Sequence, residues 1–396
     1  MTRTSILLAT LLAGLGSCSK TDPAPTTTPS ATESVTTSAA TVSASAAASA
    51  EAPTEAGVPQ PSANVHVKLP FDELVKISKP LAIKPAAVDL AGTKLTAVVC
   101  AVEGAPFLFK STIDGLRAIR VVGDRALLVT NDGVIRGYKL EGDGCKLVVD
   151  KTFGDAGVSK LDQKVERLST DGAGNVWAST GASAAYRLGK DGKVVAKCDA
   201  KPVGHLFVSE KGKTAIATFA NDDVVKVTFD KDACKTEKWA FTDLTNEEKR
   251  KGNLVHAQAV GFLGDMIFLG GRLTKTPEHP NDSTVVLGLD AAGKERFKIG
   301  KLDTDYATKD RFHTVNAIGP CRPGLCVLDA THRRLTAWSP KDGKFLGDVE
   351  LSALFGLREP WIPDFDRNQK AAFFIAAQDR ETKGVAEGNV FRVSGL

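Results

Sequence analysis

Residues 118–140 read AIRVVGDRALLVTNDGVIRGYKL, and this stretch decides the fold. It holds three short β-type runs, AIRVV, ALLVT and VIRGYKL, separated by Gly123-Asp124 and by Asn131–Gly133. Gly, Asp and Asn at such places are typical of tight turns between strands. The middle run, Ala126–Val129, is continuously apolar, which indicates a strand covered on both faces. The stretch therefore predicts an antiparallel meander.

The same pattern of strand, turn, strand, turn, strand recurs along the chain. The recurrences span residues 167–188, 206–229, 257–289, 314–338 and 362–393. Most units add a fourth strand after an Asp-Gly-type turn, as in residues 139–149, 188–198 and 339–346. Four strands at a period of roughly 40 to 60 residues are typical of a β-propeller blade. We therefore expect an all-β fold, a β-propeller of six four-stranded antiparallel blades.

The last unit, residues 361–396, has only three clear strands, whereas residues 93–110 contain spare β-type runs, TKLTAVVC and PFLFK. A ring closes well when an N-terminal strand completes the final blade, because no sheet edge is then left open. We expect this closure. If residues 93–110 form more than one strand of a new sheet, the alternative is seven blades.

The first 18 residues, MTRTSILLATLLAGLGSC, carry an export signal. Arg3 is followed by an apolar run, Ile6–Leu15, that is too short to span a bilayer. The end of the run, Leu15-Gly-Ser-Cys18, resembles the lipobox of bacterial lipoproteins. This resemblance implies that residues 1–17 are a signal peptide and that Cys18 becomes the lipidated N-terminus. The alternative is an ordinary signal peptide with an incidental cysteine.

Residues 18–64 form the lipidated N-terminus and a tether. Most residues here are Ser, Thr, Ala or Pro, and the first aromatic residue is Phe71. Such a segment cannot bury enough apolar surface to offset the entropy of ordering it, so we expect it to be disordered. We assign the propeller to residues 65–396. Ser19 is not the Asp that signals inner-membrane retention in some bacteria, which favours the outer membrane or a periplasm-facing position in the cell envelope.

Residues 171–179, DGAGNVWAS, resemble the turn and strand of NHL-type and YVTN-type bacterial propellers. The resemblance extends in degenerate form over about residues 118 to 393. It implies a fold and not an activity, because propellers carry many unrelated functions.

Six cysteines follow Cys18, and an even number in an exported domain indicates disulfides. Only four residues, Arg322–Leu325, separate Cys321 from Cys326, so a bridge across one hairpin is geometrically reasonable. The sequential pairs are Cys100–Cys145 and Cys198–Cys234. Metal binding is the alternative for these residues, but no C-x-x-C occurs.

Three histidines, His205, His256 and His313, precede the first strand of their units. First strands line a propeller's channel, so three imidazoles at one depth would bind zinc or another divalent metal. The arrangement is similar to lyases of six-bladed propeller fold, which hold zinc by three channel histidines. Glu166, at the equivalent position of another unit, is the candidate acid or base. Polar residues that merely face the wet channel mouth are the alternative.

Other polar stretches are interpreted as turns and loops. Asp364–Asn368 begins like a calcium loop but lacks the Gly and Glu that such a loop needs, so a polar hairpin turn is favoured. Two long insertions, Arg272–Ser283 and Asp379–Gly388, separate second and third strands. With Thr242–Asn253 they would wall a binding face.

Composition narrows the function classes. The net charge is only +4 over 396 residues, and no dense basic stripe occurs, which argues against nucleic acid as a partner. No G-x-S-x-G, H-E-x-x-H or phosphate-binding glycine loop is present. We expect a membrane-anchored binding scaffold for a protein, peptide or glycan, and no cofactor. The alternative is a metal-dependent lyase or hydrolase that uses the channel histidines; whether the chain is an enzyme stays open, with a non-enzyme favoured.

Overall fold

The computed structural model describes residues 69–104, 107–142, 145–171, 174–180, 184–198, 205–209, 214–218, 224–230, 233–238, 254–273, 283–301, 309–368 and 371–396. The chain divides into two units, Met1–His66 and Val67–Leu396, and all of the described residues belong to the second unit. The expected signal peptide, Cys18 and the tether lie outside the described residues.

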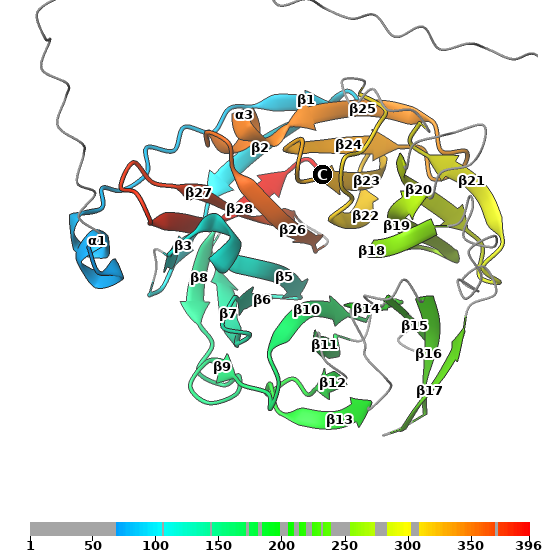
Figure 1. Ribbon diagram of the computed structural model, residues 1–396, viewed down its shortest axis with the longest axis horizontal. Coiled ribbons are helices and arrows are strands. Elements are labelled where there is room, and N and C mark those ends of the chain that lie inside the picture. Colours follow the sequence, from blue (N-terminus) through cyan, green and yellow to red (C-terminus); the bar gives the residue numbers. More distant parts are fainter. Residues whose placement is uncertain are drawn as a thin grey trace, which may run out of the picture. The chain divides into compact units, whose positions relative to one another are not determined.

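Among the described residues, six sheets are each built on four antiparallel strands, and they form the six blades of a propeller (Figure 1). The strands of blades 1 to 3 are β5 (Leu116–Val122), β6 (Arg125–Thr130), β7 (Ile135–Glu141), β8 (Lys146–Val149), β10 (Val165–Thr170), β11 (Val176–Thr180), β12 (Ala185–Leu188), β13 (Val194–Cys198), β14 (His205–Val208), β15 (Thr214–Thr218), β16 (Val224–Asp230) and β17 (Ala233–Lys238).

The remaining blades continue in the same order along the chain. Their strands are β18 (Leu254–Leu263), β19 (Met266–Leu273), β20 (Ser283–Leu289), β21 (Glu295–Ile299), β22 (Ala317–Cys321), β23 (Gly324–Asp329), β24 (Arg334–Trp338), β25 (Phe345–Glu350), β26 (Trp361–Arg367), β27 (Ala372–Asp379) and β28 (Ala386–Ser394). The first strand of each blade contacts the first strands of its neighbours around the centre (Figure 1). The six-bladed propeller expected from the repeats is thus confirmed.

An N-terminal strand closes the ring, as expected. β2 (Thr93–Val99) pairs antiparallel with β28, from Thr96 opposite Ser394 to Val99 opposite Phe391, and so supplies the fourth strand of blade 6. β1 (Val88–Leu90) pairs with the outer edge of β2. β3 (Ala101–Val102) joins β8 of blade 1, and β4 (Phe107–Phe109) joins β28. The seven-blade alternative is wrong, because these strands extend existing blades.

The core lies between the blades. Side chains alternate along β6: Ala126 and Leu128 pack against blade 6, whereas Leu127 and Val129 pack against blade 2. All four residues are fully buried. The same arrangement gives one apolar cluster at each of the six blade interfaces in the described part of the chain. A strand covered on both faces needs apolar residues at every position, which explains the unbroken apolar run.

The six cysteines after Cys18 pair as expected. Cys100–Cys145 joins the residue after β2 to the residue before β8, and thus blade 6 to blade 1. Cys198–Cys234 joins β13 to β17, the outer strands of blades 2 and 3. Cys321–Cys326 closes the β22–β23 hairpin within blade 5. Two of these three disulfides therefore fasten one blade to the next.

One polar stretch that the sequence assigned to a turn belongs to a strand. Asp364 and Asp366 lie in β26, and only Asn368 begins the turn, where its backbone and side chain bond to Ala371. Of the expected loop at residues 379–388, residues 380–385 form the β27–β28 turn, while Asp379 and residues 386–388 belong to the two strands, which remain paired as far as Asp379 opposite Ala386. Of the other expected binding loops, residues 242–253 and 274–282 lie outside the described residues.

Short helices complete the described unit: α1 (Phe71–Ile77), the 3-10 turn η1 (Thr112–Asp114) and α3 (Leu351–Phe355). α3 buries Leu351, Leu354 and Phe355 and ends at Gly356, whose φ of 65° is left-handed. In the described residues no helix has the length and apolar character needed to cross a membrane. A two-residue strand, β9 (Val158–Ser159), pairs with the start of β7.

Candidate functional site

A cavity of about 450 Å³ lies at the centre of the ring. Residues of β5, β10, β14, β18, β22 and β26 line it, so all six blades contribute. The expectation that first strands line the channel is confirmed. The cavity is within the size range of small-molecule sites, which makes it the first candidate site.

Blades 1 and 6 supply an ion pair to this cavity. Nη1 of Arg120, in β5, lies 2.6 Å from Oδ2 of Asp364, in β26. Asp364 is almost fully buried, and it also accepts the backbone N–H of Ile119 at 3.1 Å. Two residues along β26, Asp366 accepts the N–H of Val121 at 2.8 Å. The two carboxylates of β26 thus bind the backbone of β5 in the neighbouring blade.

Burial and neighbouring charges shift the pKa values of Asp366 and Arg120. Burial raises the pKa of Asp366 to about 6, because the loss of water outweighs the nearby Arg120 and the backbone N–H groups. Burial alone would lower the pKa of Arg120, but Asp364 and Asp366 outweigh it and the pKa is raised. Arg120 is therefore a fixed cation, whereas Asp366 titrates close to neutrality.

Blade 2 adds Arg167, in β10, to the lining of the cavity. Burial lowers the pKa of Arg167; Asp364 opposes this change, while Arg120 and Arg117 add to it. Among the described residues, neither an ion pair nor a hydrogen bond is present at its guanidinium. Sequence reasoning missed this group. The only signal was an arginine in the first strand of two successive units, AIRVV and VERLS.

His205 is the first residue of β14, as expected. Burial, and then the charges of Arg167 and Arg117, lower its pKa to about 3. Among the described residues, its buried Nδ1 has no hydrogen-bond partner. His205 is therefore a neutral imidazole beside guanidinium groups, an environment that disfavours a bound cation.

The structure does not place the other two histidines at the same position of their blades. His256 is the third residue of β18, and its side chain lies outside the described residues. His313 is exposed and precedes β22 by four residues; its ring contacts that of His332, with centroids 5.7 Å apart. In the described part of the chain no three His, Cys, Asp or Glu side chains are grouped to hold a metal. The three-histidine metal site stays a prediction.

Glu166 lies in β10 beside Arg167 and is half-buried. The pairing of β10 with β11 shifts register at Glu166, between Val165 opposite Thr180 and Arg167 opposite Ser179. Glu166 is absent from the lining of the central cavity. Its suggested role as acid or base stays a prediction.

Apart from Asn316, the side chains that line the opposite half of the cavity are apolar. Blades 3, 4 and 5 contribute Phe207, Val260, Phe262, Ile318 and Pro320. Charged side chains come from the other half, where Arg367 of β26 donates to the Pro320 carbonyl at 3.3 Å. The cavity is thus divided into a charged wall and an apolar wall.

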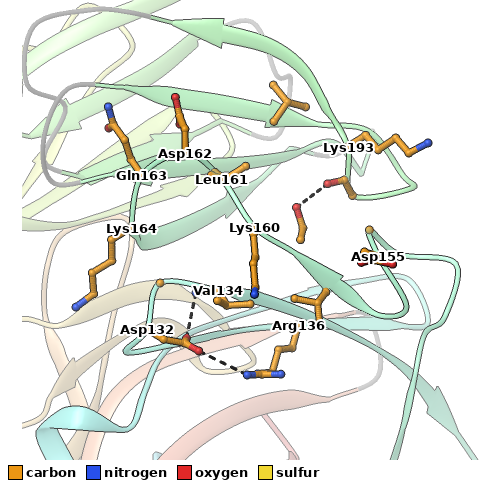
Figure 2. A pocket seen from close by; sticks show the side chains of 16 residues that line it. Asp132, Val134, Arg136, Asp155, Lys160, Leu161, Asp162, Gln163, Lys164 and Lys193 are labelled. Carbon is orange, nitrogen blue, oxygen red and sulfur yellow. Dashed lines mark hydrogen bonds and ion pairs between the residues drawn. The ribbon is translucent and has the colours of Figure 1, made fainter.

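A second hollow, of about 1250 Å³, lies between blades 1 and 2. β7, β9 and residues 160–164 and 192–194 line it (Figure 2). Figure 2 shows the Lys160 side chain extending from its ribbon toward Val134, beside the Asp132–Arg136 ion pair of 3.6 Å. This open hollow, which we call the blade 1–2 groove, has a mixed lining of lysines, carboxylates and valines. Such a lining suits a peptide or protein surface.

Comparisons with known proteins find similar folds. No protein-family model and no curated protein matches the chain. Among solved structures, the β-propeller domain of Cps50 (Swd1) from Myceliophteria thermophila is 13% identical, with a TM-score of 0.44, and the match covers 68% of this chain and 95% of that one. The WD40 β-propeller domain of Doa1 is 14% identical, with a TM-score of 0.42, and the match covers 70% and 78%. Both are β-propellers.

Proposed function

We propose that this chain is an exported lipoprotein whose propeller acts as a binding scaffold in the cell envelope. The observation that carries the proposal is the blade 1–2 groove, an open recognition surface between two rigid blades. Three disulfides support export, because they persist in oxidising compartments. The lipobox-like LGSC and the tether support anchoring through Cys18, with an outer-membrane or periplasm-facing position. An NHL-type or YVTN-type origin of the blades is part of the same proposal.

The groove fits a peptide segment of a partner protein. Its volume exceeds that of a small-molecule site, and its lining alternates between charged and apolar groups. Lys160 is exposed and, among the described residues, engages neither an ion pair nor a hydrogen bond. A carboxylate on the partner would therefore find a cation that is already in place.

Site-specific crosslinking in intact cells tests binding. A photoreactive amino acid replaces Lys160 in the groove or, as a matched control, Lys341, which is exposed in the β24–β25 turn of blade 5. We expect a discrete adduct from position 160 only. Equal adducts from both positions, or none from position 160, would contradict the proposed groove.

Metabolic labelling with a clickable fatty acid tests anchoring separately. The wild-type chain should take up the label and sediment with outer membranes, and Cys18→Ala should do neither. Membrane sedimentation of the Cys18→Ala protein would overturn the lipid anchor without bearing on the groove.

A further inference from the structure

We propose that the central cavity binds a small organic monocarboxylate, whose carboxylate pairs with Arg167 and whose apolar body lies against Phe207, Val260 and Ile318. This site is separate from the blade 1–2 groove, and the proposal is independent of the lipid anchor.

The charge of Arg167 is the first reason to expect an anion. Three arginines line the cavity in the described part of the chain, Arg120, Arg167 and Arg367. Arg120 is paired with Asp364 at 2.6 Å, and Arg367 donates to the Pro320 carbonyl at 3.3 Å. The guanidinium of Arg167 has no such partner among the described residues. Arg167 is half-buried, and a cation partly withdrawn from water without an anion costs free energy, which a bound carboxylate would reduce.

Neighbouring cations strengthen the case for an anion. Arg117 and Arg120 both act on Arg167 electrostatically, and Arg117 and Arg167 act on His205. The carboxylates that line the cavity are already engaged: Asp364 by Arg120 and the N–H of Ile119, and Asp366 by the N–H of Val121. The third, Asp171, accepts the backbone and side-chain N–H groups of Asn175. Asp364 and Glu166 act electrostatically on Arg167, but among the described residues neither carboxylate forms an ion pair with it. A planar carboxylate can accept two N–H groups from one guanidinium.

Shape and polarity select the rest of the ligand. The volume of about 450 Å³ admits a small molecule and excludes a folded partner. Opposite the charged wall, Phe207, Val260 and Ile318 are each at most 8% exposed and offer an apolar surface. An inorganic anion would leave that wall unused. The ligand therefore combines one carboxylate with an apolar body.

Saturation-transfer NMR on the full-length protein tests the site with four named probes: benzoate, octanoate and their uncharged amides, benzamide and octanamide. Inorganic phosphate competes in a fifth arm. We expect at least one carboxylate to bind with a Kd below about 1 mM and at least tenfold more tightly than its amide, since charged hydrogen bonds contribute that much. Phosphate should compete weakly.

Two substitutions separate charge from folding. Arg167→Gln should weaken carboxylate binding at least tenfold, and Arg167→Lys, which keeps the cation, should weaken it less. Arg136→Gln, in the blade 1–2 groove, is the matched control and should change nothing. If the Arg167→Gln protein does not fold, the comparison of each carboxylate with its amide on the wild-type protein still tests whether the ligand's charge contributes to binding.

Three results would overturn the proposal. Neither carboxylate binds the wild-type protein; or each amide binds as tightly as its acid, so that Arg167 contributes nothing; or phosphate binds as tightly as the organic acids, so that the apolar wall contributes nothing. None of these results bears on crosslinking from position 160. Failure of the carboxylate site is therefore distinguishable from failure of the proposed groove.

Discussion

The Arg120 guanidinium and the Asp364 carboxylate lie 2.6 Å apart, across the junction between the first blade and the last. The two residues are 244 positions apart in sequence. Their side chains are 13% and 1% exposed, so little water is available to either group. This ion pair therefore helps to hold the two ends of the ring together at the centre, while β2 holds them at the periphery.

Removing the carboxylate should destabilise the propeller. Asp364→Asn leaves a largely buried guanidinium without its main partner, and we expect a loss of about 3 kcal/mol in the free energy of unfolding. Urea denaturation followed by tryptophan fluorescence measures it. The control is Glu141→Gln, which breaks the exposed Lys146–Glu141 pair of 3.1 Å and should cost less than about 1 kcal/mol. Equal losses would contradict the role of the buried pair.

The raised pKa of Asp366 predicts one pH dependence. Its folded pKa of about 6 exceeds the ordinary value of 3.8, so the folded state binds the proton more tightly. The stabilisation is complete below about pH 3.8 and is lost as the pH rises through about 6. Compared with wild type, the Asp366→Asn protein should gain on the order of 1 to 2 kcal/mol between pH 4 and pH 7. The free energy of unfolding of each protein is measured over this pH range. A constant difference between the two proteins would refute the prediction.

His205 predicts the opposite dependence. Its folded pKa of about 3 is below the ordinary value of 6.5, so the unfolded state binds the proton more tightly. The stabilisation is present above about pH 6.5 and is lost as the pH falls toward 3. Between pH 7 and pH 5 the wild-type protein should therefore lose about 2 kcal/mol more of its free energy of unfolding than the His205→Gln protein. Denaturant titrations of both proteins at the two pH values measure this difference. The same loss of stability in both proteins would count against a buried neutral imidazole.

The disulfides should differ in how much they contribute to the stability of the folded protein. Cys198 and Cys234 are 36 residues apart, whereas Cys321 and Cys326 are 5 apart. In the chain-entropy model the longer loop restricts the unfolded chain more, so its bridge should stabilise by about 2 kcal/mol more. Paired Cys→Ser substitutions at each bridge, compared by thermal unfolding, test the order. A greater loss from the short loop would show that folded-state effects dominate.

Most of the fold could be predicted because its units repeat. Strands such as Ala126–Val129 are apolar at every position, and turns such as Asp171–Asn175 carry their own signal: Asn175 N–H donates to the Asp171 carboxylate at 2.8 Å. The disulfides followed the chain order because each joins neighbouring blades or one hairpin. Closure of the ring could be expected from the strand missing in the last unit.

The candidate site could not be predicted in the same way. Asp364 and Asp366 resemble turn residues, because their true partners are backbone N–H groups of β5 about 245 residues away. Arg167 resembles an ordinary exposed strand residue, and only the ring places it beside the cavity. Likewise, residues 379–388 resemble a loop, but Arg380 and Glu387 form a buried ion pair that lets charged residues stay inside a hairpin.

Ring closure by β2 also sets how the molecule would respond to force. A pull on the N-terminus, such as a membrane anchor would exert on a propeller held by its partner, first loads the Ala86–Ala353 hydrogen bond and β1, and then the pairing of β2 with β28. Should that pairing give way, the Cys100–Cys145 bond stops further unravelling, because it fixes the chain covalently to blade 1. The chain released up to that point, residues 69–100, is at most about 110 Å long when fully extended. The bond would act as a mechanical stop that keeps blade 1 folded under load.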